Sequence, residues 1–127
     1  MDILAAVSAH AATTGGTVVH RWRDEELTFA ELESRSTELA KTITVAFPGG
    51  SPVVVHGHKH PLMLVAFLAC VKSGHPYVPV DSSTPASRLA AIVESSGAGL
   101  LLAVDPVDLP GIEVWDREQL ASPAAGG

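Results

Sequence analysis

The pattern between residues 52 and 104 is the feature that most limits how this chain can fold. Three short apolar runs alternate there with two longer segments of helical pattern. The runs lie at residues 51–55, 77–80 and 100–104, and the helical segments at 61–73 and 84–96. Because the runs are apolar without alternation, the strands that they form should be covered on both faces, as in parallel sheets. Short connections then predict an α/β fold, a parallel βαβαβ layer with flanking helices and right-handed crossovers.

Proline and glycine mark the ends of both predicted helices. Pro61 suits the start of the first helix and Gly74 its end, while Thr84-Pro85 and Gly97 bound the second. The first helix contains ten consecutive apolar residues, Leu62 to Val71, and has almost no polar face. A helix that is apolar nearly all round should be buried, and we expect this one to be covered in a larger assembly.

The rest of the chain shows weaker secondary-structure signals. The N-terminal third predicts a helix at 2–13, a strand at 17–23, a polar turn at 24–26 and a returning strand at 27–29. Thr28 followed by Glu31 fits a capping box, so a helix should begin there and end at Pro48-Gly49-Gly50. Near the C-terminus we expect a strand at 112–115 and a helical turn at 117–120. Residues 1–120 then form one unit, and residues 121–127 form a flexible tail.

Composition narrows the class of protein. The chain has 127 residues, of which 46% are hydrophobic and 17% charged, which excludes a disordered chain or a coiled coil. A net charge of −6 provides no basic surface for nucleic acid. No apolar run reaches the length of about 20 residues that a membrane helix needs. A single cysteine forms no internal disulfide, and we expect a cytoplasmic protein with neither a nucleic-acid nor a membrane partner.

Several familiar kinds of site have only weak support. Neither G-x-G-x-x-G nor G-x-x-x-x-G-K-[ST] occurs in the chain. His56, His58 and His60 would share a face of an extended segment and could present imidazoles to zinc, but no carboxylate or cysteine stands beside them, and we interpret them as loop histidines. A catalytic Ser-His-Asp triad could be composed from Ser82 or Ser83, His75 and Asp81, but the G-x-S-x-G nucleophile elbow that would support it does not occur in the chain. Cys70 reads as a buried apolar residue.

The most specific segment of the chain is Val71 to Asp81, VKSGHPYVPVD. It resembles the second core motif of adenylate-forming enzymes, L-K-A-G-x-A-Y-V-P-x-D, with Ser73 and Pro76 in place of two alanines. The segment LTFAEL at residues 27–32 is similar to their first core motif, L-[TS]-Y-x-E-L. The residues that carry the two motifs are Leu27, Thr28, Phe29, Glu31, Leu32, Lys72, Gly74, Tyr77, Pro79 and Asp81. The pattern is most similar to amino-acid adenylation domains of nonribosomal peptide synthetases, and among them to D-alanine–carrier-protein ligases.

This resemblance implies the N-terminal part of the large subdomain of an adenylate-forming enzyme. Such enzymes join a carboxylic acid to AMP with MgATP and pass the acyl group to a carrier-protein thiol. Their phosphate loop, acyl pocket, ribose-binding aspartate and catalytic lysine come later in the family's sequences, and none of these motifs stands in these 127 residues. The resemblance therefore implies scaffold residues with no catalytic, cofactor-binding or metal-binding residue here. The partners that it implies are the remainder of the adenylation domain and a carrier protein.

Two functions stay open on the sequence. In the first, the chain is the scaffold part of an amino-acid adenylating ligase and is inactive alone. In the second, it is a non-catalytic α/β interaction module. Exposed apolar surface would favour the first, and helices that cover both faces of the sheet would favour the second.

Overall fold

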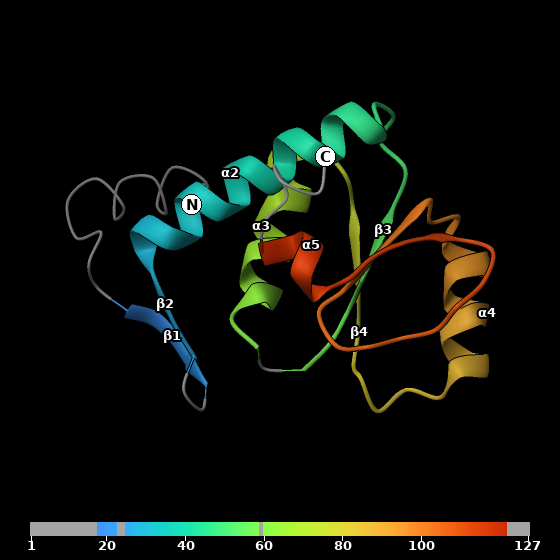
Figure 1. Ribbon diagram of the computed structural model, residues 1–127. Helices are drawn as coiled ribbons and strands as arrows, with labels where there is room; N and C mark the ends of the chain where they lie inside the picture. Colours follow the sequence, from blue (N-terminus) through green and yellow to red (C-terminus); the bar gives the residue numbers. More distant parts are fainter. Residues whose placement is uncertain (1–17, 23–24, 59, 122–127) are drawn as a thin grey trace.

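The computed structural model describes residues 18–22, 25–58 and 60–121, so the predicted helix at 2–13 and the predicted tail beyond Ala121 lie outside the described residues (Figure 1). The elements are β1 (Val18–Trp22), β2 (Glu25–Thr28), α2 (Phe29–Ala46), β3 (Val53–His56), α3 (Leu62–Ser73), β4 (Tyr77–Val80), α4 (Ala86–Ser96), β5 (Leu100–Ala103), β6 (Glu113–Trp115) and α5 (Arg117–Ala121).

A four-stranded parallel sheet in the order β4-β3-β5-β6 forms the centre of the chain. Val54 of β3 lies opposite Val78 of β4 and Leu101 of β5. Every residue of β3 and β5 is buried, which explains why their sequences are apolar without alternation. The βαβαβ prediction is confirmed, and β6 adds a fourth parallel strand.

The helices cover the two faces of this sheet unequally. Because β4 and β5 lie on opposite sides of β3, crossovers of one hand place α3 and α4 on opposite faces. Figure 1 shows α2, α3 and α5 on one face and α4 alone on the other. The larger core lies on the side of α2, α3 and α5. Leu89 is the one residue of α4 that is buried in the smaller core on the other side. Ala86, the first residue of α4, is exposed.

The N-terminal hairpin leads into α2 through the predicted capping box. β1 and β2 are antiparallel, and β2 begins at Glu25, so Glu25 and Glu26 belong to a strand and not to the predicted turn. Thr28 Oγ1 accepts a hydrogen bond from the Glu31 backbone N–H at 3.2 Å, and Glu31 Oε1 accepts one from the Thr28 N–H at 3.0 Å. These two bonds explain why α2 begins at Phe29.

The apolar helix α3 is covered mainly by this chain itself. Six of its twelve residues are buried, and it packs against the sheet, α2 and α5. This chain alone therefore buries half of the residues of a helix that we expected to be covered in a larger assembly. Its ends are as predicted, with Pro61 at the N-cap and Gly74 in the left-handed conformation at the C-cap. None of the helices in the described ranges is long and apolar enough to cross a membrane.

Candidate functional site

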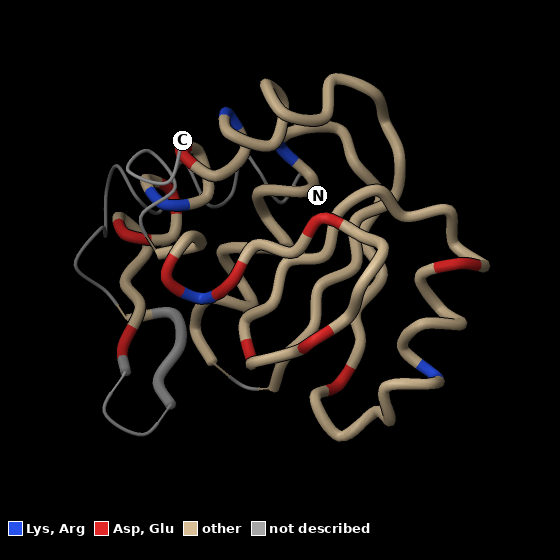
Figure 2. Tube along the Cα trace, turned by 45° about the vertical axis from the view of Figure 1, so that its right-hand side comes forward, with Lys and Arg blue, Asp and Glu red and all other residues tan. Residues whose placement is uncertain are grey.

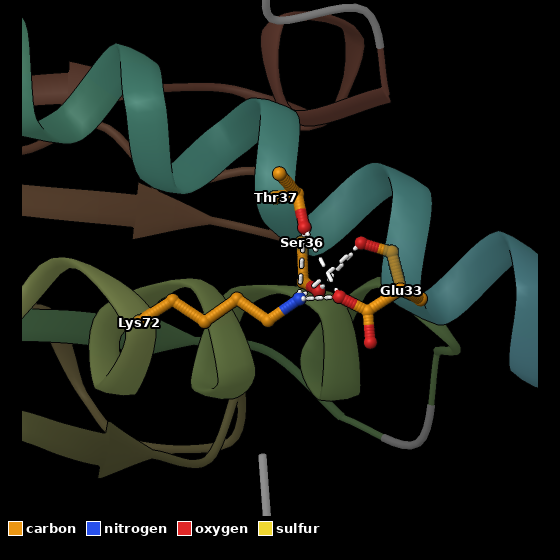
Figure 3. Close-up of polar contacts among 4 residues, drawn as sticks. All are labelled: Glu33, Ser36, Thr37 and Lys72. Atoms are coloured by element: carbon orange, nitrogen blue, oxygen red, sulfur yellow. Dashed lines mark hydrogen bonds and ion pairs between the residues drawn. The ribbon is translucent and has the colours of Figure 1, made fainter. Parts of the chain in front are cut away.

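Lys72, the lysine of the second motif, joins α3 to α2 (Figure 3). Its Nζ donates to Glu33 Oε1 at 2.6 Å, to Thr37 Oγ1 at 2.9 Å and to the Glu33 backbone oxygen at 3.3 Å. The lysine side chain is 13% exposed and the glutamate side chain 27%. Three acceptors around a largely buried ammonium form a charge-assisted network that fixes the two helices relative to each other.

Gly74 and His75 turn the chain from α3 into β4. Gly74 has φ +78°, in the left-handed region, and its N–H reaches the last carbonyls of α3. The His75 ring is buried, with Nδ1 2.7 Å from the Ser51 oxygen and Nε2 2.9 Å from the Phe47 oxygen. This one imidazole therefore links the end of α2, the start of β3 and the start of β4.

Tyr77 and Pro79 lie on β4, which is an edge strand. The Tyr77 ring packs on Phe67 of α3 with centroids 4.8 Å apart. Pro79 is exposed, and a proline is tolerated on an edge strand because no further strand needs its missing N–H. Tyr77 thus packs β4 on α3, and Pro79 lies exposed at the border of the sheet.

Asp81 follows β4 at the carboxyl edge of the sheet, where α/β sheets usually bind ligands. Its Oδ1 accepts from the Ser83 N–H at 2.9 Å, and its Oδ2 lies 3.0 Å from His58 Nδ1. These contacts, the Ser83 N–H above all, lower the pKa of Asp81 to about 2. The pair is half exposed, and its carboxylate occupies the turn that precedes α4.

The turn after β3 does not form a phosphate cradle. In nucleotide-binding loops, glycine lets the backbone approach a phosphate closely. A Cβ at Gly57 would instead meet Met63 Sδ at 2.7 Å and Val104 Cβ at 2.8 Å, so this glycine makes room for the protein's own side chains. The turn before α4 carries the Asp81 carboxylate, whose charge opposes a phosphate there. These two turns therefore do not provide a phosphate cradle.

The three histidines near β3 have different surroundings. His58 pairs with Asp81, and His60 Nδ1 accepts from the Leu62 N–H at 3.1 Å. His56 is buried in β3, and its Nδ1 has no hydrogen-bond partner among the described residues. The triad of Ser82 or Ser83 with His75 and Asp81 is not formed, because His75 and Asp81 lie at opposite ends of β4.

Sequence reasoning missed the residues that partner the motifs. Glu33 and Thr37 stand four residues apart on α2 and so share a face, and Thr37 Oγ1 donates to Glu33 Oε1 at 3.2 Å. That spacing marks them as neighbours, but nothing in the sequence connects them with Lys72, 39 and 35 residues away. Figure 2 marks the basic residues along the trace; apart from Lys72, those of the described helices are Arg35 and Lys41 on α2, Arg88 on α4 and Arg117 on α5.

Comparison with solved structures supports the architecture. The Klebsiella oxytoca NpsA N-terminal subdomain superposes with a TM-score of 0.81 at 21% identity, covering 98% of this chain and 34% of that one. The nonribosomal peptide synthetase FmoA3, in its α-methyl-L-serine-AMP-bound form, superposes with a TM-score of 0.84 at 25% identity, covering 94% and 14%. The fold is that of the N-terminal subdomain of adenylate-forming enzymes.

Sequence comparison leads to the same family. The D-alanine--D-alanyl carrier protein ligase of Bacillus cereus is 44% identical over 114 residues, which cover 87% of this chain and 23% of that protein. The Bacillus licheniformis ligase is 46% identical over 103 residues, which cover 80% and 20%. This chain thus spans about a fifth of the length of the curated relatives that it matches. The model of the family described as AMP-binding enzyme matches residues 7–124. The chain belongs to the AMP-binding enzyme family.

Proposed function

We propose that this chain is the N-terminal scaffold part of an ATP-dependent amino-acid adenylating ligase. The complete enzyme would form an acyl-AMP with MgATP and transfer the acyl group to a carrier-protein thiol. This part would supply no catalytic group and would be inactive alone. Its ten motif residues would hold α2, α3 and β4 in the arrangement on which the rest of the enzyme is built.

The observation that carries the proposal is the 44% identity to a D-alanine--D-alanyl carrier protein ligase over 87% of this chain. The geometry supports the scaffold role, because Lys72, Gly74 and Tyr77 all make contacts inside the fold. The side chains of Met63 and Val104 fill the space beside Gly57, which supports the proposal that the rest of the enzyme binds MgATP. D-alanine is the first substrate to test, since the named relatives act on it.

A non-catalytic interaction module is the second candidate. Helices lie on both faces of the sheet, and the larger core is closed by α2, α3 and α5 within this chain. Such a chain has the core of an independent unit. The partly exposed apolar side of α3, in contrast, favours a part that packs against more polypeptide.

ATP–pyrophosphate exchange tests the choice. The chain alone should give no exchange with D-alanine or any other amino acid. A hybrid enzyme in which this chain replaces the matching region of the B. cereus ligase should give D-alanine-dependent exchange. A folded hybrid without exchange would contradict the scaffold role and leave the interaction module in front.

A further inference from the structure

One side of α3 is apolar and only partly covered by the described residues. Leu64, Phe67 and Val71 recur along it at helical spacing; the first two are partly buried beside the larger core, and Val71 is 40% exposed. Tyr77, which packs on Phe67, extends this surface over the edge of β4 and is 42% exposed. We call these four residues the α3 patch.

The neighbouring surface of α2 continues the patch. A groove of about 550 Å³ runs between the two helices, and Val45 beside it is 85% exposed. The groove is lined by Thr37, Ala40, Lys41, Thr44, Val45 and Lys72. Val45, Val71 and Tyr77 are the large hydrophobic residues exposed within the described ranges, and they lie on α2, α3 and the adjacent β4.

The other face of the sheet is different in character. The outward side of α4 carries Arg88 and Glu94 among small residues, as expected of a helix that faces water. The outward side of α3 has no polar residue between Leu62 and Val71. The α3 patch is therefore the surface of the described chain that most needs a partner.

We propose that the α3 patch is the surface on which the remaining part of the adenylation domain packs, an inference that rests on the proposed function. Since this chain covers 23% of the B. cereus ligase, most of that polypeptide lies outside the matched part and has to pack against it. A second copy of this chain is the competing occupant, but a net charge of −6 on each copy opposes self-association.

The test uses Val71→Lys in the hybrid enzyme, with Ala91→Lys on the exposed side of α4 as matched control. Both positions are exposed in this chain, and a lysine is favourable near the C-terminal end of α3. If the patch is covered in the hybrid, Val71→Lys buries an uncompensated charge. We expect the half-life of the hybrid at elevated temperature, followed by tryptophan fluorescence, to shorten about tenfold or more, against little change for the control.

The same two variants of the chain alone should unfold at equal urea concentrations, because both positions are exposed in the described part of the chain. Equal half-lives of the two hybrid variants would overturn the proposal. So would a dimer of the chain alone, seen by sedimentation and dissociated by Val71→Lys, since a second copy would then occupy the patch. Fluorescence reports unfolding whether or not the hybrid catalyses exchange, so failure of the docking surface and failure of the proposed function give different results.

Discussion

Replacing Lys72 by methionine should destabilise the chain considerably more than replacing an exposed lysine on a helix would. Methionine keeps the length and apolar stem of the side chain and removes only the ammonium. Glu33 then loses its cation while 27% exposed, and the hydrogen bond to Thr37 is lost as well. The perturbation therefore isolates the charge-assisted contacts between α2 and α3.

The size of the effect follows from the burial of the pair. A fully exposed ion pair contributes about 0–1 kcal/mol, whereas breaking a fully buried one costs about 3–5 kcal/mol. With the lysine 13% and the glutamate 27% exposed, we expect an intermediate cost of about 1.5–3 kcal/mol. At a urea dependence typical of small proteins, this lowers the unfolding midpoint by about 1 M.

Urea unfolding followed by circular dichroism measures this difference. Lys41→Met is the matched control, because Lys41 is exposed on α2 and its loss should change stability by about 0.5 kcal/mol or less. Combining Lys72→Met with Glu33→Gln should show a coupling of about 1 kcal/mol or more. Equal midpoints for Lys72→Met and Lys41→Met would refute the reasoning and reduce the motif lysine to a solvated surface charge.

Three further predictions concern the turn into β4, the sheet edge and the core. Gly74→Val should cost about 1–2 kcal/mol from backbone strain alone, since a Cβ at this position would clash with no neighbouring element. His75→Ala should cost at least as much, because the buried ring contacts two carbonyls. An unchanged urea midpoint for His75→Ala would contradict the second estimate. In an NMR titration the Asp81 carboxyl should have a pKa of about 2, so stability from its contacts is present above its ordinary pKa of 3.8 and is lost as the pH falls toward about 2. Ser83→Pro, which removes the principal donor, should raise that pKa, and an unchanged value would exclude this cause. Burial raises the pKa of Cys70 to about 12, so a thiol reagent should modify it only after unfolding, and fast labelling of the folded chain would show that α3 opens.

The elements could be predicted because their signals are local. The capping box at Thr28 and Glu31, the left-handed glycine at the end of α3 and the buried valines of β3 each depend on residues close in sequence. His75 shows where such reasoning stops. It follows a helix-ending glycine, as an exposed loop residue often does, but its ring contacts lie 24 and 28 residues back in the chain. The burial of this position depends on the chain between the end of α2 and the start of β3, which the ring contacts.

The apolar sequence of α3 correctly predicts that the helix is covered, but it does not identify which part of the protein covers it. An all-round apolar helix has to be covered, and the sequence does not say by what. In the structure α3 contacts the sheet, α2 and α5, and the α3 patch lies on its remaining side. Because the first three contacts are made within this chain, the apolar surface left for more polypeptide is that of Leu64, Phe67, Val71 and the neighbouring Tyr77. The need for further cover, which the sequence predicts for the whole helix, is thereby confined to the α3 patch, and the Val71→Lys variant can test it.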